Sequence, residues 1–158
     1  MVNKFDVDKY IGIPYCKDGR AIETGFDCWG LILHLVKLLY DKELPDPSYD
    51  ISNSTEAKLV VDNYNISDYV NEISLEQIQF GDLIVMKDFM TPKELSWHVG
   101  MFIGNKDVIH CTLHSGIVVN KLLSLKRQLI SIQRISQRST ERIHIPRNII
   151  PKSAISGN

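Results

Sequence analysis

Three residues of the chain are of the types that together make an activated thiol: Cys28, His98 and His110. A thiol becomes a nucleophile when a neighbouring base takes its proton, and a third polar group can hold that base in orientation. In this arrangement His98 accepts the proton of Cys28, and His110 accepts a hydrogen bond from the far ring nitrogen of His98. Taken singly, each of the three residues is more ordinarily a structural one.

The segment around Cys28 predicts a long helix. Asp27 or Thr24 is placed to cap its start, and the two prolines of "ELPDP" predict its end near residue 41. After Cys28, apolar residues recur at helical spacing: Leu31, Ile32, Leu35, Val36, Leu38 and Leu39.

The position of Cys28 suits a nucleophile. It lies on the apolar stripe of the helix, so we expect the thiol to point at the sheet. At the first turn it also lies beside unpaired backbone N–H groups, which favour the thiolate. Gly30 costs a helix roughly 1 kcal/mol relative to alanine, which indicates that another backbone or a substrate comes close there.

The second half of the chain predicts strands joined by short turns, over residues 83–87, 97–104, 107–113, 116–123 and 129–135. Helix first and antiparallel hairpins afterwards indicate an α+β domain, with the helix packed on one face of a five- to six-stranded antiparallel sheet. Residues 46–79 are less regular: 54–65 could be a helix capped by Ser54 or Thr55, and "SLEQI" one further turn.

Strand parity decides whether the two histidines meet. If the hairpin loop is Gly104–Lys106, then Gly100 pairs with His110, and His98 and His110 become diagonal neighbours on one face. Gly100 between them would then leave room for the Cys28 helix. A two-residue turn of Asn105 and Lys106 would instead place the histidines on opposite faces.

The remaining cysteines and histidines fit structural roles. Cys16, in a loop, is the rival nucleophile but lacks a helix start, and Cys111 alternates away from His110 into the core. We interpret His34, His114 and His144 as structural.

Composition indicates a single globular domain over residues 1–158, with 44% hydrophobic and 23% charged residues. We expect no cofactor or metal, and neither nucleic acid nor a membrane as partner. Without a signal-like apolar segment, we expect synthesis in the cytoplasm, and three cysteines favour free thiols. Residues 121–158 carry eight basic side chains and one acidic one, which we interpret as a solvated surface.

Four blocks, "YIGIPYCKDGR", "GFDCWGLI", "FGDLIVMK" and "WHVGMFIGNKDVIHCT", resemble in order and spacing the NlpC-type family of papain-like cysteine peptidases. The resemblance implies a papain-like fold with Cys28 as nucleophile, His98 as base and His110 as third member. It implies further that Tyr15 helps to bind the oxyanion together with the backbone N–H of Cys28. Tyr15, Trp29 and Gly100 would line the oxyanion and substrate site, and Asp27 would be a helix cap.

Members of this family usually hydrolyse the amide between D-glutamate and a diamino acid in peptidoglycan stem peptides, through an acyl-enzyme and without a metal. Tryptophan at position 29, where bacterial wall hydrolases commonly have serine, is similar to forms found in phage tail tips. The resemblance therefore implies a hydrolase incorporated in a phage tail, with tail proteins as partners. The alternatives are a catalytically silent tail adaptor, or a thiol amidase or acyltransferase on another small amide.

Departures from the family pattern bear on substrate preference. The usual Gly-Gly after the "PY" element is Asp18-Gly19 here, and Phe80 replaces a common proline. The stretch 88–97 is long for a connection between two strands, so we interpret it as a flap beside His98.

Overall fold

A computed structural model describes residues 5–46, 69–87 and 97–136 of the chain. The expected helix capped by Ser54 or Thr55, residues 88–96 of the expected flap and His144 lie outside these residues. Trp97, the last residue of the expected flap, begins a strand instead. In chain order the elements are η1 (Val7–Lys9), β1 (Arg20–Ala21), β2 (Gly25–Phe26), α1 (Cys28–Tyr40), β3 (Val70–Ile73), η3 (Leu75–Gln77), β4 (Leu83–Lys87), β5 (Trp97–Phe102), β6 (Asp107–Thr112), β7 (Gly116–Lys121), η4 (Leu122–Gln128) and β8 (Leu129–Ile135).

Helix α1 forms where the apolar spacing predicts it, because its stripe can be buried against the sheet. Leu31, Ile32 and Leu35 are fully buried. Asp27 is the cap, while the hydroxyl of Thr24 bonds the carbonyl of Ala21 instead. The helix ends because Asp41 adopts a left-handed conformation and its N–H bonds the carbonyl of Lys37.

The sheet has six strands in the order β3-β8-β4-β5-β6-β7, every pair antiparallel. Strands β4 to β7 form the expected run of hairpins. Strand β8 does not continue this run beside β7: the 3-10 helix η4 carries the chain back, and β8 pairs with β4. This return gives β4 a partner along its second edge and leaves β7 as an edge of the sheet.

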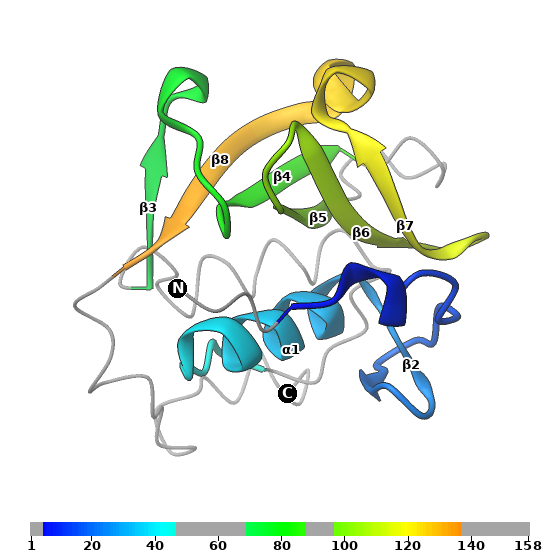
Figure 1. The fold of residues 1–158 in the computed structure, drawn as a ribbon. Helices are drawn as coiled ribbons and strands as arrows, with labels where there is room; N and C mark the ends of the chain where they lie inside the picture. Colours follow the sequence, from blue (N-terminus) through cyan, green and yellow to red (C-terminus); the bar gives the residue numbers. More distant parts are fainter. Residues whose placement is uncertain (1–4, 47–68, 88–96, 137–158) are drawn as a thin grey trace, which may run out of the picture.

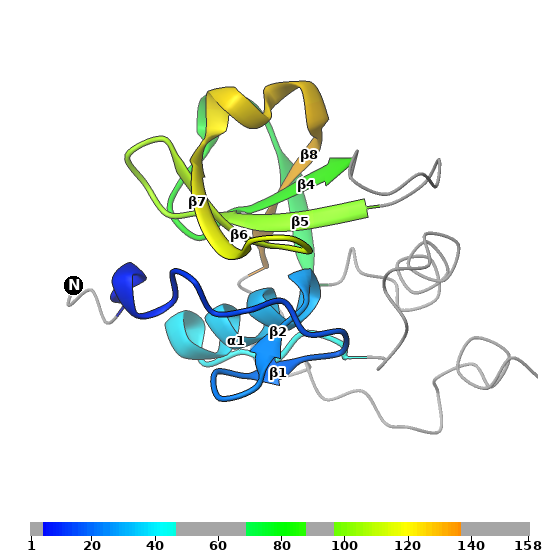
Figure 2. The ribbon, with the colours of Figure 1, turned by 90° about the vertical axis from the view of Figure 1, so that its right-hand side faces the viewer.

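Two cores lie on the two faces of the sheet. Helix α1 lies on one side of the sheet and η4 on the other (Figures 1 and 2). The first contains the buried side of α1 with Val99, Met101 and Ile109, and the second contains Ile84 and Phe102 with their neighbours from η4 and β8. The curled sheet therefore separates the helix layer from η4, as Figure 2 shows. The expectation of an α+β fold with one helix packed on a six-stranded antiparallel sheet is confirmed.

The loop between β5 and β6 has the register that brings the histidines onto one face. Gly100 pairs with His110, and the N–H of Ile103 bonds the carbonyl of Asp107 at 2.9 Å. Asn105 and Lys106 both have positive φ, which lets the chain reverse tightly within the loop. The three-residue loop is confirmed, and the alternative that separates the histidines is wrong.

Two smaller segments also bear on the predictions. "SLEQI" forms one turn, η3, as expected, while β3 was not predicted.

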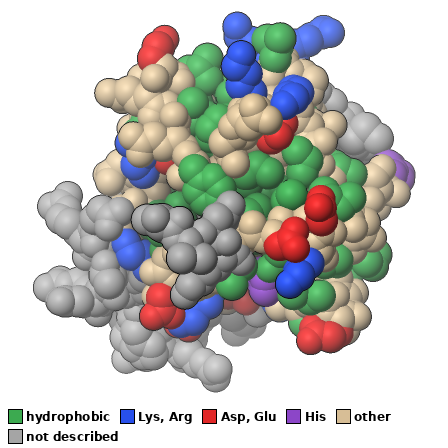
Figure 3. Space-filling model, in the orientation of Figure 1, with side chains coloured by type: hydrophobic (Ala, Val, Ile, Leu, Met, Phe, Trp, Pro, Cys, Tyr) green, Lys and Arg blue, Asp and Glu red, His purple; other side chains and the backbone are tan. Residues whose placement is uncertain are grey.

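The surface in Figure 3 carries hydrophobic side chains across its middle, with acidic and basic side chains around them. Among the described residues, no helix has the length and apolar character needed to cross a membrane.

Candidate active site

Cys28 is the first residue of α1, and its position is fixed by the cap that precedes it. A carboxylate oxygen of Asp27 accepts the backbone N–H of Gly30 at 2.7 Å. Asp27 is buried, and Cys28 is 8% exposed. The first-turn N–H groups of a helix make this end favourable for negative charge, so a thiolate at Cys28 is placed where the helix stabilises it.

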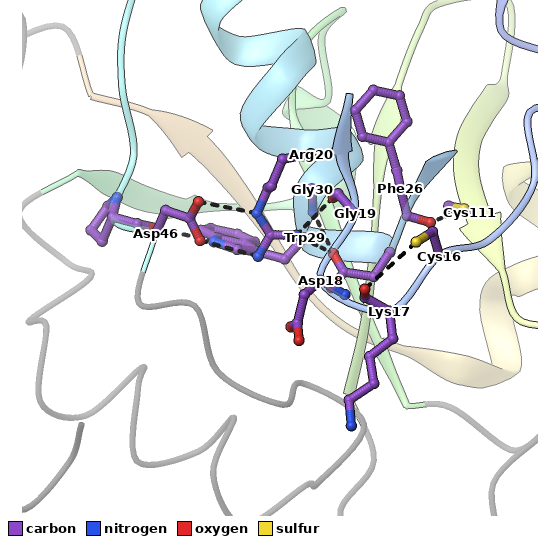
Figure 4. A network of polar contacts seen from close by, with 12 residues as sticks. Cys16, Lys17, Asp18, Gly19, Arg20, Phe26, Trp29, Gly30, Asp46 and Cys111 are labelled. Carbon is purple, nitrogen blue, oxygen red and sulfur yellow. Dashed lines mark hydrogen bonds and ion pairs between the residues drawn. The ribbon is translucent and has the colours of Figure 1, made fainter. Parts of the chain in front are cut away.

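Asp27 also ties the preceding loop to the helix. It accepts the N–H of Asp18 at 3.0 Å and pairs with Arg20 at 2.9 Å. Arg20 reaches past the helix start to Asp46, which it contacts through two nitrogens at 3.0 and 3.1 Å (Figure 4). Burial nevertheless raises the pKa of Asp27, because desolvation outweighs these donors.

Gly30 permits the close contact between that loop and α1. A Cβ at position 30 would overlap the carbonyl oxygen of Gly19 and would lie 2.8 Å from an Arg20 nitrogen. The expectation that another backbone approaches Gly30 is confirmed. The approaching group is the Gly19 carbonyl, and Figure 4 shows the two glycines side by side with Arg20.

Tyr15 and Trp29 flank the same helix start. The backbone of Tyr15 forms a bridge with Phe26, two residues before Cys28, and its side chain is partly buried against the first core. The indole N–H of Trp29 donates to the carbonyl of Pro45 at 2.9 Å. Trp29 thus holds the segment after the helix, and the roles of both side chains toward a substrate remain predictions.

His98 and His110 are in direct contact, as the parity argument predicts. Nε2 of His98 lies 2.7 Å from Nδ1 of His110, and the two rings meet edge to face. His110 is 5% exposed, and His98 is partly exposed. A base with one ring nitrogen held by a buried partner has its orientation fixed.

Burial keeps both imidazoles neutral at physiological pH. Desolvation, with a smaller contribution from neighbouring His110, lowers the pKa of His98 to about 3. Desolvation also lowers the pKa of His110, against the opposing effect of a hydrogen bond from its side chain to Asn120. A neutral His98 has a lone pair that can accept a proton, and an imidazolium there would gain a partner once a thiolate forms beside it.

The two faces of β5 pack against different cores, which corrects one expectation. Val99 and Met101 pack with α1, whereas Phe102, on the same face as His98 and Gly100, packs in the second core. Because alternate side chains point to opposite faces, the face of the histidines is not the face that α1 covers along most of the strand.

Gly100 makes room for strand β6 and not for the helix. The three atoms nearest to a Cβ at position 100 are the Ile109 carbonyl oxygen at 2.8 Å, a Val108 methyl at 2.9 Å and the His110 Cβ at 3.0 Å. The glycine therefore lets β6 come unusually close, which brings His110 to His98. Our expectation that it leaves room for the Cys28 helix is wrong. Its place in a substrate site remains a prediction.

Cys28 can approach His98 at the end of β5, because both residues stand at the ends of their elements. Cys28 begins α1, and His98 is the second residue of β5. Helix α1 packs against β5, and Figure 2 shows the N-terminal end of α1 below the end of the sheet where β5 begins. Contact between the thiol and the imidazole at this corner remains a prediction.

Asn120 contacts the histidine pair, and this was not predicted from the sequence. Its Oδ1 lies 2.6 Å from Nε2 of His110. Continuing the parity argument across the next hairpin would have found it: His110 pairs with Val118, and Asn120 is two residues further on the same face. The result is a row of three polar side chains across β5, β6 and β7.

The other two cysteines are placed differently from Cys28. Cys111 is buried, donates to the carbonyl of Phe26 at 3.1 Å, and has its pKa raised to about 12, mainly by burial. Its assignment to the core is confirmed. Cys16 is partly exposed in its loop, with its sulfur 3.7 Å from the carbonyl of Lys17. All three cysteines are free thiols, as expected.

His34 has the structural role expected of it. Its Nε2 lies 2.9 Å from the hydroxyl of Tyr10, its ring packs against Phe26, and burial lowers its pKa. His114 is exposed in the turn between β6 and β7. Within residues 5–46, 69–87 and 97–136, no group of three or more His, Cys, Asp and Glu side chains is arranged to hold a metal ion.

Comparison with known proteins gives a consistent picture. The model of the NlpC/P60 family matches residues 12–138. The Escherichia coli K12 protein named murein DD-endopeptidase MepS/murein LD-carboxypeptidase is 22% identical over 130 residues. These cover 81% of this chain and 58% of that relative, so the chain spans little more than half the relative's length.

Solved structures show the same fold. The NlpC/p60 domain of the peptidoglycan hydrolase SagA superposes with a TM-score of 0.56 at 19% identity, over 82% of this chain and 92% of that one. A lipoprotein-like NLP/P60 family protein of Staphylococcus aureus gives a TM-score of 0.56 at 25% identity, over 84% and 43%. The expected papain-like arrangement, a cysteine helix on an antiparallel sheet, is thereby confirmed.

Proposed function

The chain belongs to the NlpC/P60 family, and from this we propose that it is a cysteine endopeptidase that hydrolyses amide bonds in peptidoglycan stem peptides. The observation that carries the proposal is the bonded pair of His98 and His110 at the end of the sheet where α1 begins with Cys28. Covalent amide hydrolysis requires a nucleophile and an oriented base, and we assign these roles to the cysteine at the capped helix start and to the bonded imidazole pair.

The proposed reaction proceeds through an acyl-enzyme. His98 takes the thiol proton, and the sulfur of Cys28 adds to the amide carbonyl carbon. The resulting oxyanion is held by the backbone N–H of Cys28 and the hydroxyl of Tyr15. The C–N bond then breaks, and the amine leaves with the proton from His98. Water, activated by His98, hydrolyses the thioester and restores the thiol.

The bond cut is proposed from two sources that differ. The sequence resemblance favours the amide between D-glutamate and the diamino acid. The name of the Escherichia coli relative, a murein DD-endopeptidase and LD-carboxypeptidase, favours a cross-link or a terminal D-residue as second candidate. Both belong to peptidoglycan peptides, so the substrate class is common to the two.

We further propose that the enzyme acts as part of a phage tail. What supports this is Trp29, the residue after the nucleophile, which resembles the tail-tip forms. Its anchoring to Pro45 gives the larger side chain a fixed place beside Cys28. Co-purification of the chain with tail particles, detected by mass spectrometry, is the test, and absence of the chain from purified virions would refute the proposal.

The function is tested by mass spectrometry of defined muropeptides incubated with the protein. Wild type is expected to release products cut at the D-glutamyl bond, whereas Cys28→Ala releases none. Cys16→Ala is the matched control, because it removes a thiol that is more exposed than Cys28 and should keep full activity. Products cut only at DD cross-links would establish the second candidate. Equal products from wild type and Cys28→Ala would refute the thiol mechanism.

A further inference from the structure

We propose that Asn120 is a positioning residue that determines which nitrogen of His98 carries the proton. The inference rests on the proposed thiol chemistry, in which His98 is the base. Its geometry lies in the row of His98, His110 and Asn120 across three neighbouring strands, with separations of 2.7 and 2.6 Å between the bonded atoms.

The row begins at an atom that can only accept. The side chain of Asn120 turns its amide oxygen, which has lone pairs and no proton, toward His110, and with this atom facing it Nε2 of His110 is the donor in the 2.6 Å bond. A neutral imidazole carries one proton. With that proton on Nε2, Nδ1 of His110 has a lone pair and accepts.

The proton position on His110 in turn fixes the proton position on His98. Because Nδ1 of His110 accepts, Nε2 of His98 must donate across the 2.7 Å contact. The single proton of neutral His98 is then on Nε2, and its Nδ1 has the lone pair needed to take a proton from a thiol. Asn120 thus selects the tautomer of His98 that can accept a proton, although it contacts His98 only through His110.

The opposite arrangement would be inactive. If His110 carried its proton on Nδ1, it would donate to Nε2 of His98, and the His98 proton would move to Nδ1. That nitrogen could then donate a hydrogen bond but not remove a proton. Both arrangements satisfy the contact between the imidazoles equally, so that contact cannot choose between them. The bond to Asn120 does choose, because the structure turns its amide oxygen and not its NH2 group toward His110.

Two features of the fold support this role over a purely structural one. His110 is 5% exposed and can exchange few hydrogen bonds with water. Asn120 is exposed on β7, so its side chain is not needed to fill a core. Removing the amide oxygen therefore changes the hydrogen bond to His110 with little effect on packing.

The variants Asn120→Leu and Asn120→Asp separate the acceptor from the shape of the side chain. Leucine matches asparagine in size but cannot accept. Aspartate keeps the acceptor and adds a negative charge. Lys121→Gln is the control for charge: it changes the net charge by the same amount on the adjacent residue, whose side chain pairs with Asp107 on the other face.

The primary measurement is ¹⁵N NMR of histidine-labelled protein at pH 8.5, where both imidazoles are neutral. In wild type we expect the proton on Nε2 of both His98 and His110. Asn120→Leu should lose this pattern at both residues, and Asn120→Asp should retain it. Protonation of His98 at Nδ1 in wild type, or an unchanged pattern in Asn120→Leu, would overturn the proposal.

Muropeptide hydrolysis supplies the kinetic measurement. A lost hydrogen bond of ordinary strength predicts that Asn120→Leu lowers kcat by about tenfold with little change in KM, and that Asn120→Asp stays within about twofold of wild type. Equal losses in both variants would overturn the proposal. If wild type cleaves no muropeptide, the proposed function fails, while the NMR result still decides the role of Asn120.

Discussion

Replacing Gly30 by alanine sets two physical effects against each other. By helix propensity alone, alanine inside α1 should stabilise the protein by roughly 1 kcal/mol. The structure predicts the opposite sign, because the new methyl group would overlap the carbonyl oxygen of Gly19 and crowd both Arg20, at 2.8 Å, and Asp27, at 3.2 Å. A backbone carbonyl cannot yield as the end of a flexible side chain can, so the loop must move.

The magnitude follows from what that movement breaks. Overpacking a filled site costs about 1–3 kcal/mol, and weakening the Arg20–Asp27 pair adds about 1.5–3 kcal/mol because the carboxylate is buried. After the gain in helix propensity is subtracted, the net loss of stability is about 1.5–5 kcal/mol. For a domain of this size the melting temperature should fall by roughly 3–20 °C.

Thermal unfolding followed by circular dichroism measures this loss. Leu38→Ala is the matched control on α1, because Leu38 is exposed and its truncation should change the stability by less than about 1 kcal/mol. A melting temperature for Gly30→Ala equal to or above that of wild type would refute the reasoning. It would mean that the loop is not held against the helix as described.

Gly100→Ala should lower both stability, by about 1–3 kcal/mol, and the hydrolysis rate, since a methyl group 2.8 Å from the Ile109 carbonyl pushes β6 and His110 away. Unchanged melting temperature and rate would contradict this. Stability should also depend on pH, because burial lowers the pKa of His34, His98 and His110 in the folded protein. Between the lowered pKa of each histidine and its ordinary pKa of about 6.5, the unfolded chain binds more protons than the folded one. Stability is then complete above pH 6.5 and falls as the pH drops, by up to ~1.4 kcal/mol per pH unit for each histidine. Equal denaturant midpoints at pH 7.5 and 5 would refute this prediction. Histidines with an ordinary pKa would make the hydrolysis rate fall below about pH 6. Because burial lowers the pKa of His98 and His110, the rate should fall only at a lower pH.

The sequence was sufficient to predict the local features of the site. The helix starting at Cys28 follows from apolar spacing and a capping residue, and the contact of His98 with His110 follows from strand parity and one loop length. These features depend on residues close together in the chain, whose geometry is regular.

The long-range features could not be predicted in the same way. A run such as 129–135 indicates a strand but not its partner, and β8 turns back to pair with β4, whose paired residues lie 43 to 50 positions earlier in the chain. The wrong interpretation of Gly100 has a similar cause: parity shows which residues share a face, but not which face the helix covers. The place of Asn120 beside His110 could have been predicted, because strand parity applies in the same way to the next hairpin, between β6 and β7.

The activation of Cys28 by His98 is tested most directly by the rate at which iodoacetamide alkylates each cysteine at pH 7.5, resolved by peptide mass spectrometry. Cys28 should react about tenfold or more faster than the more exposed Cys16, and His98→Gln should remove this difference in rate. Alkylation of Cys28 no faster than that of Cys16, or equally fast in wild type and His98→Gln, would contradict the activation of Cys28 by His98.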